Sequence, residues 1–212
     1  MNFINDPAAI EAESFAIIAT ELGKRQLPAD AADIIKRVIH TSADFDYADN
    51  LVFSPGAVTI AQQALLNQAN IITDTKMALA GINKGALQQL GVEAYCFIDD
   101  DQVIADARQN GTTRSWAAVH QAAARLTRPL IFVVGNAPTA LYALHELITT
   151  NRLQVDLIIA VPVGFVNVVE SKELILTLPT AHIVARGRKG GSNVAAAIVN
   201  ALTYSLVERA DL

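Results

Sequence analysis

Short apolar runs alternate with helical patterns through most of this chain, and that alternation restricts the fold more than any other feature. Apolar runs bounded by turn residues are typical of strands that are covered on both faces. Five such strands are expected, at residues 71–73, 94–98, 130–134, 157–161 and 182–185. Strands that alternate with helices form mainly parallel sheets. The sequence therefore predicts an α/β fold with a three-layer, doubly wound, mainly parallel sheet of about five strands.

Helical patterns fill the segments around these strands. The expected helices cover residues 56–68, 74–80, 99–108, 114–126, 138–150, 170–177 and 191–207. Two N-terminal helices come before them. The first begins at Asp6-Pro7 and ends at Gly23, and the second begins near Pro28 and ends close to His40.

The segment between the second helix and the first sheet strand is less regular. Residues 44–50 are polar and turn-like, whereas residues 51–53 are apolar, short and β-like. No linker, low-complexity segment or internal repeat divides the chain. We therefore expect residues 1–212 to form a single domain.

Composition excludes several classes of protein. The net charge of -5 disfavours general binding to nucleic acid or to a membrane surface, because both partners usually need a basic face. No apolar run reaches the roughly 18 residues of a membrane span, and residues 1–6 do not resemble a secretory signal. The single cysteine, Cys96, lies in an apolar run and is expected to be a reduced, buried thiol. These features favour a cytoplasmic protein.

In a doubly wound sheet, ligands bind beyond the carboxyl ends of the strands. The turns expected there are residues 74–77, 135–139, 162–167 and 186–192, and we call them the rim. They are small, polar and rich in glycine.

The last rim turn, which contains Arg186, Arg188 and Lys189, is a glycine-rich cationic loop followed at once by a helix. Glycine allows close approach to a ligand, and the start of a helix presents free N–H groups and partial positive charge. This combination favours an anion with several carboxylates or phosphates. The alternative is a surface turn whose charges are solvated.

Motifs for several common chemistries are absent from the sequence. It contains no phosphate-loop motif, no dinucleotide-binding glycine pattern after the first strand and no nucleophile elbow. The four histidines are far apart, and with one cysteine a zinc site is not expected. Residues 99–101, three aspartates, are interpreted as the N-terminal cap of a helix rather than as a metal site. An enzyme of this kind would use proton transfer or a binding-driven rearrangement.

Ten segments of the chain together resemble the precorrin-8X methylmutases, also called precorrin isomerases, of corrin ring biosynthesis. The segments are Ile10–Ile18, Arg37–Thr41, Val52–Val58, Asp74–Met77, Ala80–Ile82, Gly111–Ser115, Val134–Leu141, Pro162–Val166, Glu170–Lys172 and Gly187–Ser192. They span nearly the whole chain in the expected order, and the full set is specific although each one alone is weak.

The resemblance implies an isomerase that moves a methyl group from C-11 to C-12 of precorrin-8X or cobalt-precorrin-8, giving hydrogenobyrinic or cobyrinic acid. It also implies a flavodoxin-like fold and a homodimer. No separate cofactor and no protein-bound metal are expected, because any cobalt belongs to the corrinoid substrate.

The resemblance also assigns site residues. The histidine of its R-x-[IV]-H segment, His40 here, is implied to be the general acid, which typically contributes about 10²–10⁴-fold. Ser14 is implied as a hydrogen-bond partner and Arg114 as a substrate contact. Further expected substrate contacts are Thr75, Asn136, Lys172, Arg186 and Arg188. Lys189 and the backbone at 190–192 are also expected to bind the carboxylates. The apolar ring is expected to contact Ala137, Val163 and Phe165.

Two other interpretations stay open on the sequence alone. A non-catalytic corrinoid-binding carrier would keep the same fold and pocket without turnover. A nucleotide-binding doubly wound domain is a third possibility, although the missing phosphate motifs count against it.

Overall fold

One six-stranded sheet forms the centre of the structure, a computed structural model that describes residues 4–208. The strands are β1 (Leu51–Phe53), β2 (Asn70–Thr73), β3 (Ala94–Tyr95), β4 (Leu130–Val134), β5 (Leu157–Ala160) and β6 (His182–Ala185). Their order is β1-β6-β5-β4-β2-β3, and every neighbouring pair is parallel except β1 with β6. The predicted mainly parallel sheet is confirmed, and the β-like segment at 51–53 adds an antiparallel edge strand to it.

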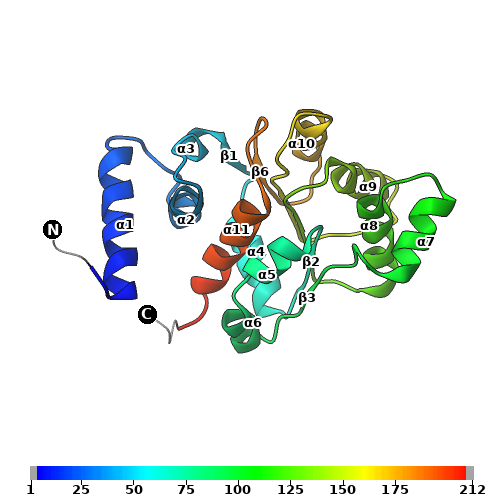
Figure 1. Cartoon of the computed structure of the whole chain (residues 1–212), viewed down its shortest axis with the longest axis horizontal. Coiled ribbons are helices and arrows are strands. Elements are labelled where there is room, and N and C mark those ends of the chain that lie inside the picture. The colour runs from blue at the N-terminus through cyan, green and yellow to red at the C-terminus, as the bar shows by residue number, and fades with distance from the viewer. Residues whose placement is uncertain (1–3, 209–212) are drawn as a thin grey trace.

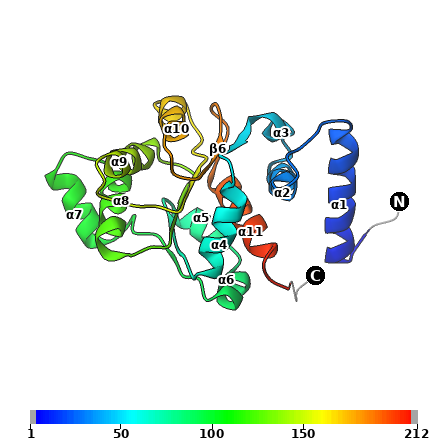
Figure 2. The same ribbon diagram turned by 180° about the vertical axis from the view of Figure 1, so that it is seen from behind.

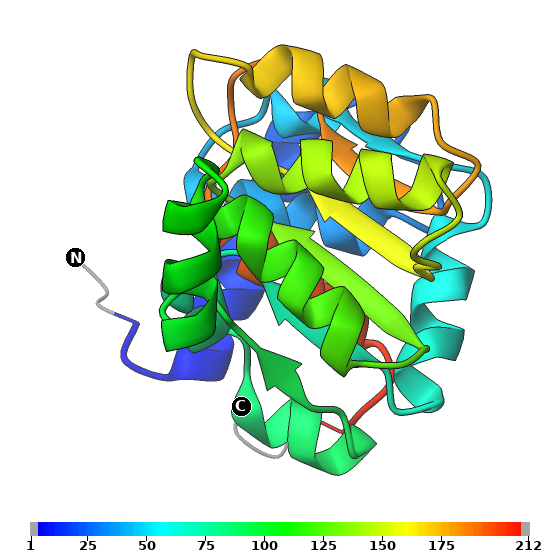
Figure 3. The same cartoon turned by 90° about the vertical axis from the view of Figure 1, so that its right-hand side faces the viewer.

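Helices cover both faces of this sheet and give the predicted three layers. They are α1 (Pro7–Leu22), α2 (Ala32–Ser42), α3 (Tyr47–Asn50), α4 (Ala57–Leu66), α5 (Lys76–Gly81), α6 (Lys84–Leu90), α7 (Asp101–Gln109), α8 (Arg114–Arg125), α9 (Pro138–Thr149), α10 (Val168–Leu176) and α11 (Ser192–Tyr204). In Figure 3, α7 to α10 (green to gold) lie in front of the strands, with α4 (cyan) and α11 (red) behind them.

Alternation along the strands builds a separate core on each face. In β4, Ile131 and Val133 pack with the α2, α4 and α11 side, whereas Leu130, Phe132 and Val134 pack with the α7 to α10 side. All five side chains are buried. The uninterrupted apolar run of β4 therefore follows from its position in the middle of a sheet that is covered on both faces.

The two N-terminal helices form an outer layer. Figures 1 and 2 show α2 between α11 and α1, and α1 at one end of the molecule. The carboxylate of Asp6 caps α1 by accepting the N–H of Ala9 at 2.8 Å, and Gly23 ends the helix with a left-handed φ of 59°. Both ends of this helix agree with the prediction.

Several predicted boundaries differ from the structure. The strand expected at 94–98 is shorter in the structure, where only Ala94 and Tyr95 pair with β2, opposite Ile71 and Ile72. The second helix begins at residue 32, later than predicted, and the turn-like segment at 44–50 contains the short helix α3.

Helix α6 is not among the helices predicted from the sequence, although its end signals are present. The side chain of Asn83 accepts the N–H of Ala86 at 2.9 Å, and Gly91 ends the helix in a left-handed conformation. The aspartates at 99–101 lie at the start of a helix, as predicted: Asp100 is the N-cap residue of α7 and Asp101 is in its first turn. Asp100 makes no side-chain capping bond, however, and pairs with Arg125 at 2.8 Å.

Within residues 4–208, none of the helices has both the length and the apolar character needed to cross a membrane. Two predictions concern residues outside the described range. They are residues 1–3 of the segment that does not resemble a secretory signal, and residues 209–212 at the end of the expected single domain.

Candidate active site at the carboxyl edge of the sheet

The carboxylate of Asp74 lies at the topological switch point of the sheet, directly after β2. The next strand along the chain, β3, lies on one side of β2, and the strand after that, β4, lies on the other side. Its oxygens accept the backbone N–H groups of Gly135, Asn136 and Ala137 at 2.9, 2.8 and 2.7 Å. Burial raises the pKa of Asp74, while these three N–H groups act in the opposite direction. N–H groups at such a switch point bind phosphates in many doubly wound folds. Here they are taken by a side chain of the protein itself, which removes support for a nucleotide site.

Thr75 connects two turns of the rim. Its hydroxyl oxygen accepts the N–H of Ala78 at 3.0 Å and lies 2.7 Å from the hydroxyl of Ser192 at the start of α11. Thr75 is half-buried, whereas Asn136 on the neighbouring turn is exposed. Of these two predicted contacts, Asn136 has the more accessible side chain.

Two glycines allow the rim turns to pack closely. A Cβ atom on Gly135 would lie 2.8 Å from the Cα atom of Ser192, and one on Gly190 would lie 2.1 Å from the carbonyl oxygen of Val161. Both distances are far below van der Waals contact. The rim is therefore built from backbone segments that touch one another.

Two cations of the loop Arg186–Gly191, which we call the cationic loop, are paired with carboxylates. Lys189 Nζ lies 2.6 Å from oxygens of both Asp44 and Asp46, which follow α2, and the hydrogen bond to Asp44 raises the pKa of Lys189. Arg186 pairs with Glu173 of α10 at 3.2 Å. Lys189, predicted to bind substrate, thus joins the end of α2 to the loop.

Arg188 differs from its neighbours in the cationic loop. It is exposed, its guanidinium lies 5.5 Å from the ring centre of Phe165, and no ion pair joins it to another residue in the described range 4–208. A cation held over an aromatic ring keeps its N–H donors at the ring's edge available. Of the three loop cations, Arg188 is the one best placed to bind an anion.

Exposed apolar side chains lie on the rim turns, and one of them, Phe165, contacts this arginine. Phe165 is 81% exposed, Val166 76% and Val163 48%, all in the turn after β5, and Met77 at the start of α5 is 71% exposed. Val163 and Phe165 were predicted for this role, whereas Ala137 is only 8% exposed and has little surface to offer. Met77 and Val166 were not singled out, although both belong to rim segments.

Lys172 has a different environment from the one a substrate contact requires. Its side chain is fully buried in α10, and Nζ donates hydrogen bonds to the carbonyl oxygens of Gly187 and Lys189, both at 2.8 Å. Burial lowers the pKa of Lys172 to about 8. In this structure the lysine contacts the loop, and only the loop faces solvent.

His40 lies in the last turn of α2 and is exposed. Its ring stacks on Phe15 of α1, with centroids 5.4 Å apart, and the guanidinium of Arg37 lies 4.9 Å from the same Phe15 ring. Ser14, one residue before Phe15, donates its hydroxyl to the carbonyl oxygen of Ile10 at 2.7 Å. Phe15 was not predicted as a site residue, yet it supports the imidazole directly.

Arg114 is the first residue of α8 and is also exposed. The preceding Thr113 caps this helix and donates to the hydroxyl of Thr139 at 2.7 Å, which joins the start of α8 to the start of α9. Arg114 contributes, after Lys76, to lowering the pKa of Asp99. A second exposed cation therefore lies at the rim, on the α8 side.

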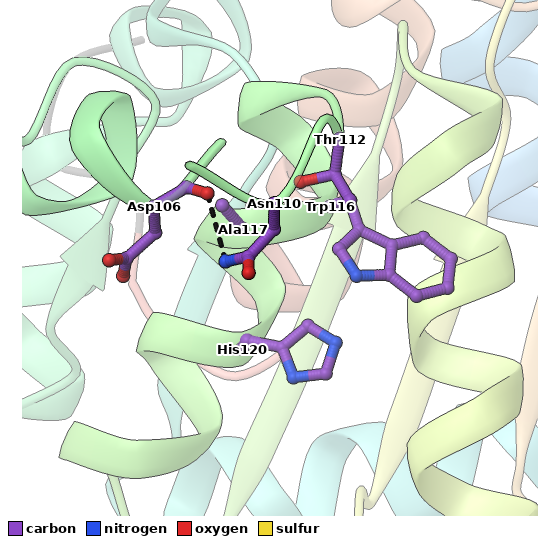
Figure 4. A pocket seen from close by; sticks show the side chains of 6 residues that line it. All are labelled: Asp106, Asn110, Thr112, Trp116, Ala117 and His120. Atoms are coloured by element: carbon purple, nitrogen blue, oxygen red, sulfur yellow. Dashed lines mark hydrogen bonds between the residues drawn. The ribbon is translucent and has the colours of Figure 1, made fainter. Parts of the chain in front are cut away.

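A pocket of about 310 Å³ between α7 and α8 contains none of the predicted site residues (Figure 4). It is lined by Asp106, Asn110, Thr112, Trp116, Ala117 and His120. Burial lowers the pKa of His120. Among residues 4–208, no three His, Cys, Asp or Glu side chains come together as a metal site would require.

Comparison with known proteins places this arrangement among enzymes of one kind. The family model described as precorrin-8X methylmutase matches residues 9–205. The cobalt-precorrin-8 methylmutase of Salmonella typhimurium is 47% identical over 213 residues, covering 98% of this chain and 100% of that protein. The precorrin-8X methylmutase of Pseudomonas aeruginosa is 37% identical over 204 residues, covering 95% of this chain and 97% of that protein.

A solved structure gives the same result. The precorrin-8X methyl mutase from Thermus thermophilus superimposes with a TM-score of 0.85 at 37% identity, covering 92% of this chain and 96% of that chain.

Proposed function

The chain belongs to the precorrin-8X methylmutase family, and from that membership we propose that it moves a methyl group from C-11 to C-12 of a corrinoid ring. It is an isomerase of cobalamin biosynthesis. The proposed substrate is precorrin-8X or cobalt-precorrin-8, and the corresponding product is hydrogenobyrinic acid or cobyrinic acid.

The observation that carries the proposal is the pairing of exposed apolar side chains with a free cation on the rim. A corrinoid has an apolar ring with acetate and propionate carboxylates at its edge. Val163, Phe165 and Val166 offer an apolar surface of the kind that monomeric proteins seldom expose without a partner. Arg188 lies directly beside it and can donate paired, charge-assisted hydrogen bonds to a carboxylate.

We assign the proton transfer to His40. Its imidazolium gives a proton to the conjugated ring, the methyl group migrates with its bonding electrons, and the proton is then returned. Substrate and product are isomers, so atoms and electrons balance within one molecule. Stacking on Phe15 supports this role because it fixes the plane of the imidazole while the ring stays exposed.

The other site assignments follow from accessibility. Arg114 and Asn136 are exposed at the rim and are proposed to bind peripheral groups of the substrate. Arg186 would exchange its partner Glu173 for a substrate carboxylate, and Thr75 would contact substrate from its bonded position beside Ser192. Ser14 can still accept a hydrogen bond through its hydroxyl oxygen.

No separate cofactor is proposed, and any cobalt is part of the substrate. We also propose that residues 1–212 act as one domain in the cytoplasm and assemble as a homodimer. The exposed Ile10 and Ile17 of α1, at 46% and 48%, support the dimer. Sedimentation of the purified protein would test it, and a monomer at micromolar concentration would contradict it.

Incubation with precorrin-8X, followed by absorption spectroscopy of the chromophore, tests the function. We expect the spectrum to change to that of hydrogenobyrinic acid without any added cofactor. Tight binding with an unchanged spectrum would support the carrier interpretation instead. Failure to bind precorrin-8X and its cobalt form would contradict both. A comparison of turnover with the two forms would identify the natural substrate.

A further inference from the structure

Lys172 is a buried cation whose contacts are all within the protein. Its exposed fraction is 0%, and in α10 it lies on the same buried face as Val168, Ser171 and Ile175. None of the ion pairs within residues 4–208 includes it. An ammonium group buried without a carboxylate is costly, and an apolar side chain would fill the same space at a lower cost. We therefore expect the ammonium group of Lys172 to have a role beyond filling space in the core.

The hydrogen bonds of Lys172 identify what it holds. Nζ binds the carbonyl oxygens of Gly187 and Lys189, the two residues that flank Arg188. The carbonyl oxygen of Arg188 accepts the N–H of Gly164 at 3.1 Å. Three successive carbonyl groups of the cationic loop are thus bound from the protein side.

This arrangement determines the direction of one side chain. With its own carbonyl and both neighbouring carbonyls fixed, Arg188 extends over Phe165 and remains exposed. Gly164 and Phe165 belong to the turn after β5. The hydrogen bond from Gly164 to Arg188 and the contact of Arg188 with Phe165 therefore hold this cation beside the apolar surface of that turn. Because the ammonium is not neutralised by a carboxylate, it also adds positive potential beneath the loop.

We propose that Lys172 is a positioning residue, which holds the cationic loop so that Arg188 meets a carboxylate of the substrate. The proposal rests on the proposed corrinoid function of the rim. It replaces a direct contact between Lys172 and substrate with an action through the loop.

The first test does not need a substrate. The cationic loop contains three trypsin sites, and a loop that loses its anchor is cleaved faster. We expect native-state trypsin cleavage after Arg188 or Lys189 to be about tenfold faster in K172M than in wild type, because two charge-assisted hydrogen bonds are lost. The control is K84M, which removes an exposed lysine of α6 and should leave cleavage in the loop unchanged.

The second test measures affinity for hydrogenobyrinic acid by absorption titration in wild type, K172M, R188A and the double variant. A charge-assisted hydrogen bond corresponds to roughly tenfold to hundredfold in affinity, so K172M and R188A should each weaken binding by about that factor. The double variant should bind about as weakly as R188A alone, because Lys172 acts through Arg188. A purely structural role would instead give additive losses.

The results separate the two claims. Unchanged cleavage in folded K172M, or additive losses in the double variant, would overturn the positioning role. Wild-type protein that does not bind hydrogenobyrinic acid would overturn the corrinoid assignment, whereas the cleavage test would still report on the loop. If K172M does not fold, K172Q takes its place: its side chain is polar but uncharged and shorter by one bond, so the two charge-assisted hydrogen bonds are still lost and the same faster cleavage is expected.

Discussion

Single side chains hold the backbone of the rim and leave a few others free for a ligand. Asp74 binds three N–H groups of one turn, and Lys172 binds two carbonyl groups of another. Each of these fixed turns carries an exposed polar side chain, Asn136 on the first and Arg188 on the second. We attribute the precision of the site to these internal bonds, because they remove most of the freedom that glycine-rich turns would otherwise have.

Substitution D74N tests the first of these bonds. The amide group would place N–H donors against the N–H groups of Gly135, Asn136 and Ala137, leaving buried donors without acceptors. We expect a loss of about 1–3 kcal/mol in the free energy of unfolding, measured by urea denaturation. The exposed Asp30 provides the control, and D30N should change stability by less than about 0.5 kcal/mol. Equal effects of the two substitutions would contradict this role of Asp74.

Substitution G190A tests the close packing of the rim. The added methyl group would lie 2.1 Å from the carbonyl oxygen of Val161, so the loop must move. We expect a loss of about 3 kcal/mol in the free energy of unfolding. In the control G111A, the glycine has a φ of 62° and open space around it, and we expect about 1 kcal/mol from backbone strain alone. Similar losses in both variants would mean that the loop is not tightly packed.

The individual roles could be read from the sequence only in part. His40 at the end of a helix, Arg114 at the start of another and Arg188 in the cationic loop lie where the sequence predicts them, and all three are exposed. Lys172 is predicted from the sequence as a substrate contact, although its spacing from Val168, Ser171 and Ile175 is that of the buried face of a helix. The carboxylate of Asp74 could not be assigned, because its partners are 61 to 63 residues away in the chain.

Helices α1 and α2 carry the proposed proton donor and connect it to the rim. Phe15 of α1 stacks on His40, and Asp44 and Asp46, just after α2, pair with Lys189 of the cationic loop. Helix α2 also packs along α11, which begins at the rim (Figure 1). The periodicity of α2 indicates its buried face, but it does not indicate which helix lies against that face.

Removal of the Phe15 ring tests this connection. In F15A the imidazole of His40 loses its support, and a small displacement of a catalytic group can lower its rate severely. We expect kcat to fall by about tenfold to hundredfold while the affinity for hydrogenobyrinic acid stays close to that of wild type. The control is T20A, an exposed position of the same helix, which should leave kcat unchanged. A normal kcat in F15A would contradict the support that we assign to Phe15.

The pair between Asp44 and Lys189 predicts a response to acid. Lys189 donates to Asp44 and holds the pKa of that carboxyl below its ordinary value of 3.8. A lowered folded-state pKa contributes stability above the unfolded pKa, and this contribution is lost as the pH falls through the folded value. In D44N the urea midpoint should therefore fall less steeply with pH below 3.8 than in wild type. In the control D30N, which changes an exposed aspartate, the urea midpoint should depend on pH as it does in wild type. The same dependence of the midpoint on pH in wild type and D44N would contradict a contribution of the pair to stability.

Across the whole chain, the alternation of strands and helices was sufficient to predict the five parallel strands of the sheet, because buried parallel strands have a continuous apolar pattern. It did not predict the antiparallel pairing of β1 with β6. It was not sufficient to predict the outer layer. Helix α1 has apolar residues on more than one side, with Ile10 and Ile17 exposed and Ile18 and Leu22 buried. Such a pattern does not mark one inner face, so the packing of α1 on α2 had to come from the structure.

The family and the fold lead to one central claim: a corrinoid lies on the rim and receives a proton from His40. Its parts come from distant segments, with the proton donor near residue 40 and the carboxylate clamp near residue 188. The structure joins them through Lys189, Asp44 and Asp46.

Single-turnover conversion of precorrin-8X by wild type, H40A and H145A is the measurement that tests this claim most directly. His145 lies on α9, on the opposite side of the sheet from α2, and serves as the matched control. We predict that H145A converts the substrate at the wild-type rate, and that H40A binds it with nearly normal affinity but converts it about 10²–10⁴-fold more slowly. Near-normal conversion by H40A would contradict the proposed role of His40 as proton donor.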